Sequence, residues 1–103
     1  MNLDHFQSLI EDTYLERDTQ RGIEGTFMWF TEEVGELARA LQGSDRDNLN
    51  EEIADVLAWL STLASLSGIQ LSEAAARYSG GCPKCDSIPC DCPDRSDSPP
   101  SQP

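Results

Sequence analysis

Two acidic stretches organise the chain: Glu32-Glu33-Val34-Gly35-Glu36 and Glu51-Glu52-Ile53-Ala54-Asp55. Glu33 and Glu36 stand three residues apart, and Glu52 and Asp55 repeat that spacing. On a helix this spacing puts both side chains on one face, with their Cβ atoms about 5–6 Å apart. Like charges so placed destabilise an isolated helix, so the pattern indicates that a hard cation compensates them.

Apolar residues recur at helical spacing on both sides of these stretches, which predicts helices over residues 3–17, 26–42, 49–67 and 71–78. Two glycines predict a loop over residues 19–25, and Thr26 is the expected N-cap of the second helix. No segment alternates apolar and polar residues as a strand does. The expected fold class is therefore all-α, a four-helix bundle.

The predicted second helix has an apolar stripe that should be buried: Phe27, Phe30, Val34, Leu37 and Leu41. The predicted third helix is apolar on more than one side, which favours packing in a bundle or a dimer. A chain of 103 residues buries only a small core. We therefore expect oligomerisation, a metal site, or both to complete the fold.

The charge balance excludes some partners. The net charge is −12, with 19 acids against 7 lysines and arginines. Such a surface has no basic stripe for direct binding to duplex nucleic acid or to an anionic membrane. No stretch approaches the roughly 20 apolar residues of a membrane span, and the N-terminus lacks the order of a signal peptide. The sequence predicts a cytoplasmic protein.

Acids on a helix most often form a solvated face, and two features argue against that interpretation here. Gly35 lies inside the predicted helix, where the missing side chain lets another backbone approach closely. The acids also occur on consecutive helices, which pack antiparallel and can bring their acidic turns together. Carboxylates converging in this way suit Mg²⁺ or Mn²⁺. The candidate ligands are Glu33, Glu36, Glu52 and Asp55, and either Glu32 or Glu51 could orient or deprotonate a water.

The motif Glu32-Glu33-x-x-Glu36 followed by Glu52-x-x-Asp55 resembles the EExxE…ExxD signature of the MazG-like, all-α nucleoside triphosphate pyrophosphohydrolases. The resemblance covers about residues 3–80, and some small members of that group also end in a cysteine-rich segment like the one here. It implies a Mg²⁺-dependent enzyme, with catalytic Glu32, Glu33, Glu36, Glu52 and Asp55, that hydrolyses a nucleoside triphosphate to the monophosphate and pyrophosphate. It also implies a homodimer or homotetramer, with housecleaning of the nucleotide pool as one role.

Aromatic and basic residues suggest where a nucleotide would sit. Trp29 and Trp59 each lie four residues from the acids, toward the same end of an antiparallel pair, where a base could stack. Packing in a core or an interface is an equally good explanation of both tryptophans. Positive charge is scarce, so three arginines are candidate phosphate contacts, although a plain surface role is the better explanation of any one of them: Arg17, Arg21 and Arg77.

All four cysteines fall within eleven residues near the C-terminus: Cys82, Cys85, Cys90 and Cys92. The first pair is a CxxC and the second a tighter CxC, and four thiolates so close can surround a Zn²⁺ ion. Free thiols and disulfides are the alternatives. With every coordination position filled by protein, such a zinc would be structural.

The sequence thus predicts three regions: a helical pyrophosphohydrolase domain at 1–79, a four-cysteine zinc knuckle at 80–93 and a disordered tail at 94–103. The alternative to an enzyme is a non-catalytic interaction module, in which the acidic helices bind a stabilising ion and the cysteine knuckle contacts a protein partner.

Overall fold

The structure is a computed structural model that describes residues 1–93. Over this range it contains α1 (Leu3–Gln42), α2 (Arg46–Leu66), α3 (Leu71–Ala75) and the 3-10 turn η1 (Ala76–Tyr78). No strand occurs among these residues, so the predicted all-α class is confirmed. The chain divides into two compact units, Met1–Ser72 and a second that begins at Glu73. The tail predicted at 94–103 lies outside the described residues.

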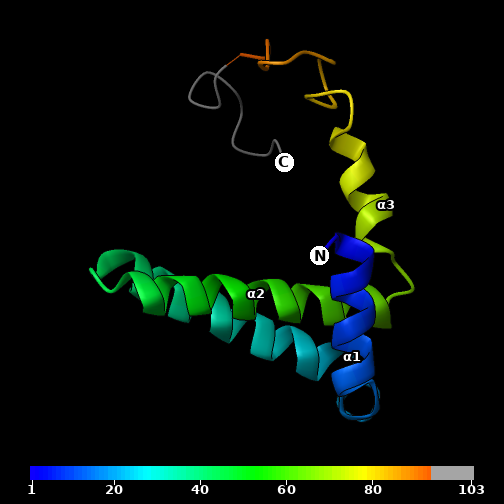
Figure 1. Cartoon of the computed structure of the whole chain (residues 1–103), viewed down its shortest axis with the longest axis vertical. Coiled ribbons are helices and arrows are strands. Elements are labelled where there is room, and N and C mark those ends of the chain that lie inside the picture. Colours follow the sequence, from blue (N-terminus) through cyan, green and yellow to red (C-terminus); the bar gives the residue numbers. More distant parts are fainter. Residues whose placement is uncertain (94–103) are drawn as a thin grey trace. The chain divides into compact units, whose positions relative to one another are not determined.

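The first two predicted helices form one bent element, α1. Gly22 alone departs from helical geometry, with φ +80° and ψ 174°, a region that only glycine occupies readily. The break predicted between residues 19 and 25 is therefore present, but it is one residue long. Figure 1 shows the two parts of α1, blue and cyan, running in different directions, with α2 (green) beside the second part.

The N-cap predicted at Thr26 is wrong, because the helix resumes directly after Gly22. Thr26 lies inside α1 and is completely buried, and its hydroxyl oxygen accepts a hydrogen bond from Arg21 Nη1 at 3.3 Å. The N-caps in the structure are Asn2 for α1 and Asp45 for α2. Asn2 Oδ1 accepts from the His5 amide at 2.8 Å, and Asp45 Oδ1 accepts from the Asn48 amide at 3.1 Å. These bonds satisfy backbone donors that each first turn leaves free.

The third and fourth predicted helices differ from the structure mainly at their ends. With Asp45 as its cap, α2 begins at Arg46, three residues before the predicted start. The predicted helix over 71–78 is α-helical only to Ala75 and continues as η1. Such tightening is usual where a short helix ends, and Gly80 and Gly81 follow at once.

The interior of the first unit is largely polar. Among the described residues, the only buried apolar side chains are Ala40 and Ala64. The other buried positions are polar: Gln7, Asp18, Thr26, Ser61 and Thr62. Gln7 and Thr62 form hydrogen bonds between α1 and α2 that fix the pairing of these helices, since buried polar groups are costly unless they are partnered. Ser61 Oγ is buried without a hydrogen-bond partner.

The apolar stripe expected to be buried on residues 26–42 is exposed along much of its length. Phe27 is 54 % exposed, Val34 43 % and Leu41 63 %. On α2, Ile53 and Leu60 are also more than 40 % exposed. The close backbone approach expected at Gly35 is absent as well, because a Cβ there would meet nothing within 4 Å. One chain has too few helices to cover these faces, so the expected burial does not occur within it.

No single helix among residues 1–93 is both long and apolar enough to cross a membrane, although α2 and residues 71–78 meet the length and composition criteria together as a broken pair.

Gln7 joins the start of α1 to the end of α2. Its side chain is 1 % exposed, and its Nε2 donates to Ser65 Oγ at 3.1 Å and to the Ile69 carbonyl at 2.8 Å. Its Oε1 accepts from the Leu71 amide at 2.7 Å. One side chain thus satisfies three groups where the chain leaves α2.

We expect Gln7→Leu to lower the free energy of unfolding by about 1–3 kcal/mol, because it leaves the part-buried Leu71 amide and Ile69 carbonyl without their partner. Urea unfolding followed by circular dichroism measures the change. Gln20→Leu is the control, since Gln20 is exposed on the same helix. Equal stability of the two variants would contradict this role.

Candidate active site

Three of the predicted acidic ligands meet between α1 and α2. Glu33 comes from the second part of α1, and Glu52 and Asp55 come from successive turns of α2. One carboxylate oxygen of each lies within 4.8 Å of the other two. The i,i+3 spacing on α2 puts two acids on one face, and the pairing of the helices brings the third to them.

The electrostatics of this group favour a cation. Partial burial and the negative charges of Asp55 and Glu52 raise the pKa of Glu33 above its ordinary value. The Oε2 atom of Glu52 is buried and has no hydrogen-bond partner. An unpartnered buried carboxylate oxygen is costly, and a positive ion among the three acids would remove the cost. The residues present therefore fit a divalent metal.

Glu36 is not one of the three gathered acids. Its carboxylate forms an ion pair with Arg39, one turn further along α1. Its charge still contributes to the raised pKa of Glu33, so it lies nearby. Glu32 and Glu51, the two predicted helpers, are exposed. The structure thus brings together three of the four predicted ligands and leaves the fourth at the edge.

A cavity of about 260 Å³ shares Asp55 with the acidic group. It lies between the first part of α1 and the middle of α2. Its lining residues are Ile10, Tyr14, Arg17, Asp18, Arg21, Asp55, Ala58, Trp59 and Thr62. A site that joins carboxylates to a partly aromatic cavity has the composition expected of a small-molecule site.

Buried polar contacts hold one wall of this cavity. Asp18, only 4 % exposed, pairs with Arg21 at 2.9 Å and accepts from Thr62 Oγ1 at 3.1 Å. The Arg21 guanidinium lies 4.9 Å from the Trp59 ring centroid. Asp18 and Thr62 were not predicted as site residues. The available signal was the i,i+3 pair formed by Asp18 and Arg21, which is common on solvated helices and so did not stand out.

The two tryptophans stack on each other, with ring centroids 6.3 Å apart and planes 15° apart. Trp59 lines the cavity, whereas Trp29 does not and is half exposed. Of the predicted arginines, Arg17 and Arg21 line the cavity. Arg77 belongs to the second unit, where its guanidinium lies 5.7 Å from the Tyr78 ring centroid.

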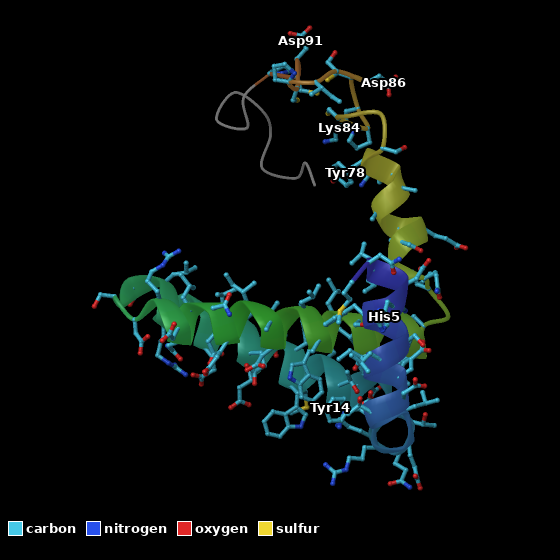
Figure 2. All side chains as sticks on the ribbon, viewed as in Figure 1. His5, Tyr14, Tyr78, Lys84, Asp86 and Asp91 are labelled. Atoms are coloured by element: carbon cyan, nitrogen blue, oxygen red, sulfur yellow. The ribbon has the colours of Figure 1, made fainter. Side chains whose placement is uncertain are left out.

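The four cysteines form a separate cluster in the second unit and are placed to bind a metal, with their sulfur atoms all within 4.8 Å of one another. Figure 2 marks their neighbours Lys84, Asp86 and Asp91 in the same loop. The Asp91 amide lowers the pKa of Cys85 to about 6, whereas the neighbouring thiols raise the pKa of Cys92 to about 12. Crowding therefore keeps the cysteines from all ionising together without a compensating positive charge.

The fold and this site define an all-helical protein whose carboxylates, carried on two paired helices, face a small cavity. Residues 21–80, more than half of the chain, match the model of the MazG nucleotide pyrophosphohydrolase domain. The chain therefore belongs to the MazG family. The matched span contains the acidic group but neither the first part of α1 nor the cysteines. Comparison with curated protein sequences found no match.

We expect Glu33→Gln to raise the melting temperature at neutral pH without divalent metal, by about 1–2 °C for a few tenths of a kcal/mol. Folding raises the pKa of Glu33, so stability falls as the pH rises through that pKa, and the glutamine removes this loss. The benefit should shrink in acid, where Glu33 is protonated.

With Mg²⁺ added, the wild type should melt at a higher temperature than Glu33→Gln. An ion that binds the folded protein stabilises it, and Glu33→Gln removes a ligand. Differential scanning calorimetry with and without Mg²⁺ measures both effects. Glu24→Gln, an exposed acid on α1, should change neither. The same Mg²⁺ response in both variants would rule Glu33 out as a ligand.

Proposed function

We propose that the chain is a Mg²⁺-dependent pyrophosphohydrolase that converts a ribo- or deoxyribonucleoside triphosphate and water into the monophosphate and pyrophosphate. The observation that carries the proposal is the group of Glu33, Glu52 and Asp55, whose crowded charges and unpartnered oxygen a cation would compensate. Family membership supports a nucleotide as the substrate. A hard cation on carboxylates is also how proteins commonly bind substrate phosphates.

Glu33, Glu52 and Asp55 would hold Mg²⁺ or Mn²⁺, and Glu36 would join them on leaving its ion pair with Arg39. When bound, the metal supplies positive charge to the phosphates and to the attacking water. Glu32, exposed beside Glu33, would accept the proton of that water. In this proposal Glu32 is the general base, and the other acids are metal ligands.

The cavity beside Asp55 would hold the nucleoside. One wall is the Trp59 ring, and the Arg21 guanidinium against it is already fixed by Asp18. A base could stack in this cavity, because aromatic and guanidinium surfaces both accept a flat ring. Arg17 lines the same cavity and is exposed, so it can reach a phosphate.

A second copy of the chain would complete the helical bundle. The exposed apolar residues Phe27, Val34 and Leu41 follow one stripe of α1, and Ile53 and Leu60 follow a stripe of α2. Such faces are costly in water and are typical of helices that pack on a partner. We propose a homodimer or homotetramer. A cytoplasmic location, with no nucleic-acid or membrane partner, remains a prediction from charge and sequence.

We expect Glu52→Gln and Asp55→Asn each to lower turnover of nucleoside triphosphates roughly 100-fold or more, because metal ligands matter at least as much as the groups that orient them. The assay measures pyrophosphate and nucleoside monophosphate from ordinary and damaged nucleotides with Mg²⁺ or Mn²⁺. Both substitutions keep side-chain size and remove charge, so they change metal binding more than packing.

Two controls sharpen this assay. Glu73→Gln removes an exposed acid of the second unit and should leave turnover unchanged. Inorganic tripolyphosphate offers phosphates without a nucleoside and should be a poor substrate if the cavity binds the base. Wild-type protein that hydrolyses no nucleotide in the panel would favour the non-catalytic interaction module instead.

Size-exclusion chromatography with light scattering should give a molar mass of two or four times 11.4 kDa. Leu41→Asp should shift the distribution toward the monomer, because Leu41 is too exposed to stabilise a single chain but would be buried between copies. Ser8→Asp adds the same charge at an exposed polar position and should have no effect. A monomeric wild type at micromolar concentration would refute the assembly.

A further inference from the structure

The second unit contains a cluster of four thiols that takes no part in the acidic site. Two pairs of sulfur atoms face each other, Cys82 with Cys92 at 3.7 Å and Cys85 with Cys90 at 3.9 Å. A disulfide needs about 2.05 Å, so neither pair is bonded. The Zn–S bond is about 2.3 Å, which makes the sulfur–sulfur edge of a tetrahedral site about 3.8 Å. The observed separations match that edge.

The backbone of the loop supports this arrangement. The Asp86 amide donates to the Cys82 carbonyl at 2.7 Å, and the Cys82 amide donates to the Ser87 carbonyl at 3.1 Å. Gly81, at φ +99°, allows the closure, because a Cβ there would lie 2.7 Å from the Ser87 carbonyl oxygen. The turn that these bonds close brings the first pair of cysteines toward the second pair.

Backbone amides also point at the sulfur atoms. The Asp91 amide donates to Cys85 Sγ at 3.2 Å, and the Cys92 amide donates to Cys90 Sγ at 3.3 Å. Amide donors of this kind stabilise thiolate ligands and orient them toward a metal. These amide–sulfur bonds are a second feature, besides the sulfur–sulfur separations, that supports a metal site.

No apolar core accounts for the order of this loop. Between Glu73 and Pro93 no residue is fully buried, and the largest apolar side chains there, Tyr78 and Ile88, are 62 % and 81 % exposed. Small units without a core usually depend on disulfides or a metal. With no disulfide among the described residues, a metal is the remaining cross-link.

We propose that Cys82, Cys85, Cys90 and Cys92 bind one Zn²⁺ as a closed tetrathiolate site, and that residues 80–93 take their folded form only with the metal bound. Soft thiolates select zinc over the magnesium that suits the carboxylates. Four protein ligands leave no open position, so the zinc is structural. The site is independent of the proposed hydrolase activity.

The first experiment measures metal content in the full chain. Native mass spectrometry should find one zinc per chain, released by a thiol-modifying reagent, and Co²⁺ in its place should give the visible bands of tetrahedral thiolate coordination. Cys85→Ser and Cys92→Ser should each lose the ion. Asp86→Asn is the matched control, because it removes a carboxylate from the same loop and asparagine tolerates the φ of +58°.

The second experiment uses the single lysine of the chain, Lys84, which lies between the first two cysteines. A protease specific for lysine can therefore cut only at Lys84–Cys85. We expect zinc-loaded protein to be cut roughly tenfold more slowly than protein treated with a zinc-selective chelator, because cleavage needs the open loop.

Three results would overturn the proposal: protein isolated with two disulfides and no metal, zinc retained in both serine variants, or cleavage at Lys84 that is equally fast with and without chelator treatment. None of these readouts uses nucleotide hydrolysis. A chain that holds zinc but hydrolyses nothing would refute only the proposed function, and a zinc-free active chain would refute only this inference.

Discussion

The pairing of α1 with α2 is the constraint on which the acidic site depends, because it holds Glu33 beside Glu52 and Asp55 against their mutual repulsion. Burial, together with this repulsion, raises the pKa of Glu33, and a buried oxygen of Glu52 has no hydrogen-bond partner. In the absence of a cation, the hydrogen bonds between α1 and α2 offset the repulsion of the three carboxylates. A chain built in this way is pre-organised for a divalent ion, since binding would relieve strain that folding has already imposed.

Those interhelical bonds also explain why the interior is polar. Thr62 donates to Asp18, and Ser65 donates to Glu11 at 2.6 Å, so hydroxyls on α2 serve carboxylates on the first part of α1. Hydrogen bonds fix geometry more sharply than apolar contact does, which suits the wall of a binding cavity. The cost is a small apolar core and exposed stripes on both long helices. The polar interior and the proposed assembly thus have one cause: the side chains between the helices are polar, and the apolar side chains lie on the outer faces.

The sequence was enough to predict the helical segments and the acids that share a helix face, because periodicity and i,i+3 spacing are local properties. The meeting of Glu33 with Glu52 and Asp55 depends in addition on the pairing of α1 with α2. The length of the break at Gly22 was not predictable, since Gly25 is an equally good helix breaker in isolation and only tertiary packing decides between them. Asp18 was missed for a similar reason. An acid on a helix is solvated unless a partner such as Thr62 buries it, and that partner lies 44 residues away. The cysteine cluster could be predicted from the sequence, because ligands that lie close together in the chain depend little on tertiary packing.

The two candidate metal sites show how one chain can keep two ions apart by chemistry. The acidic site offers hard oxygen ligands from long helices, and its geometry comes from the fold of the first unit. The cysteine site offers soft sulfur ligands from eleven residues of loop, and its geometry comes from local turns and amide–sulfur bonds. Magnesium binds thiolates weakly, and a closed tetrathiolate would hold zinc away from the carboxylates.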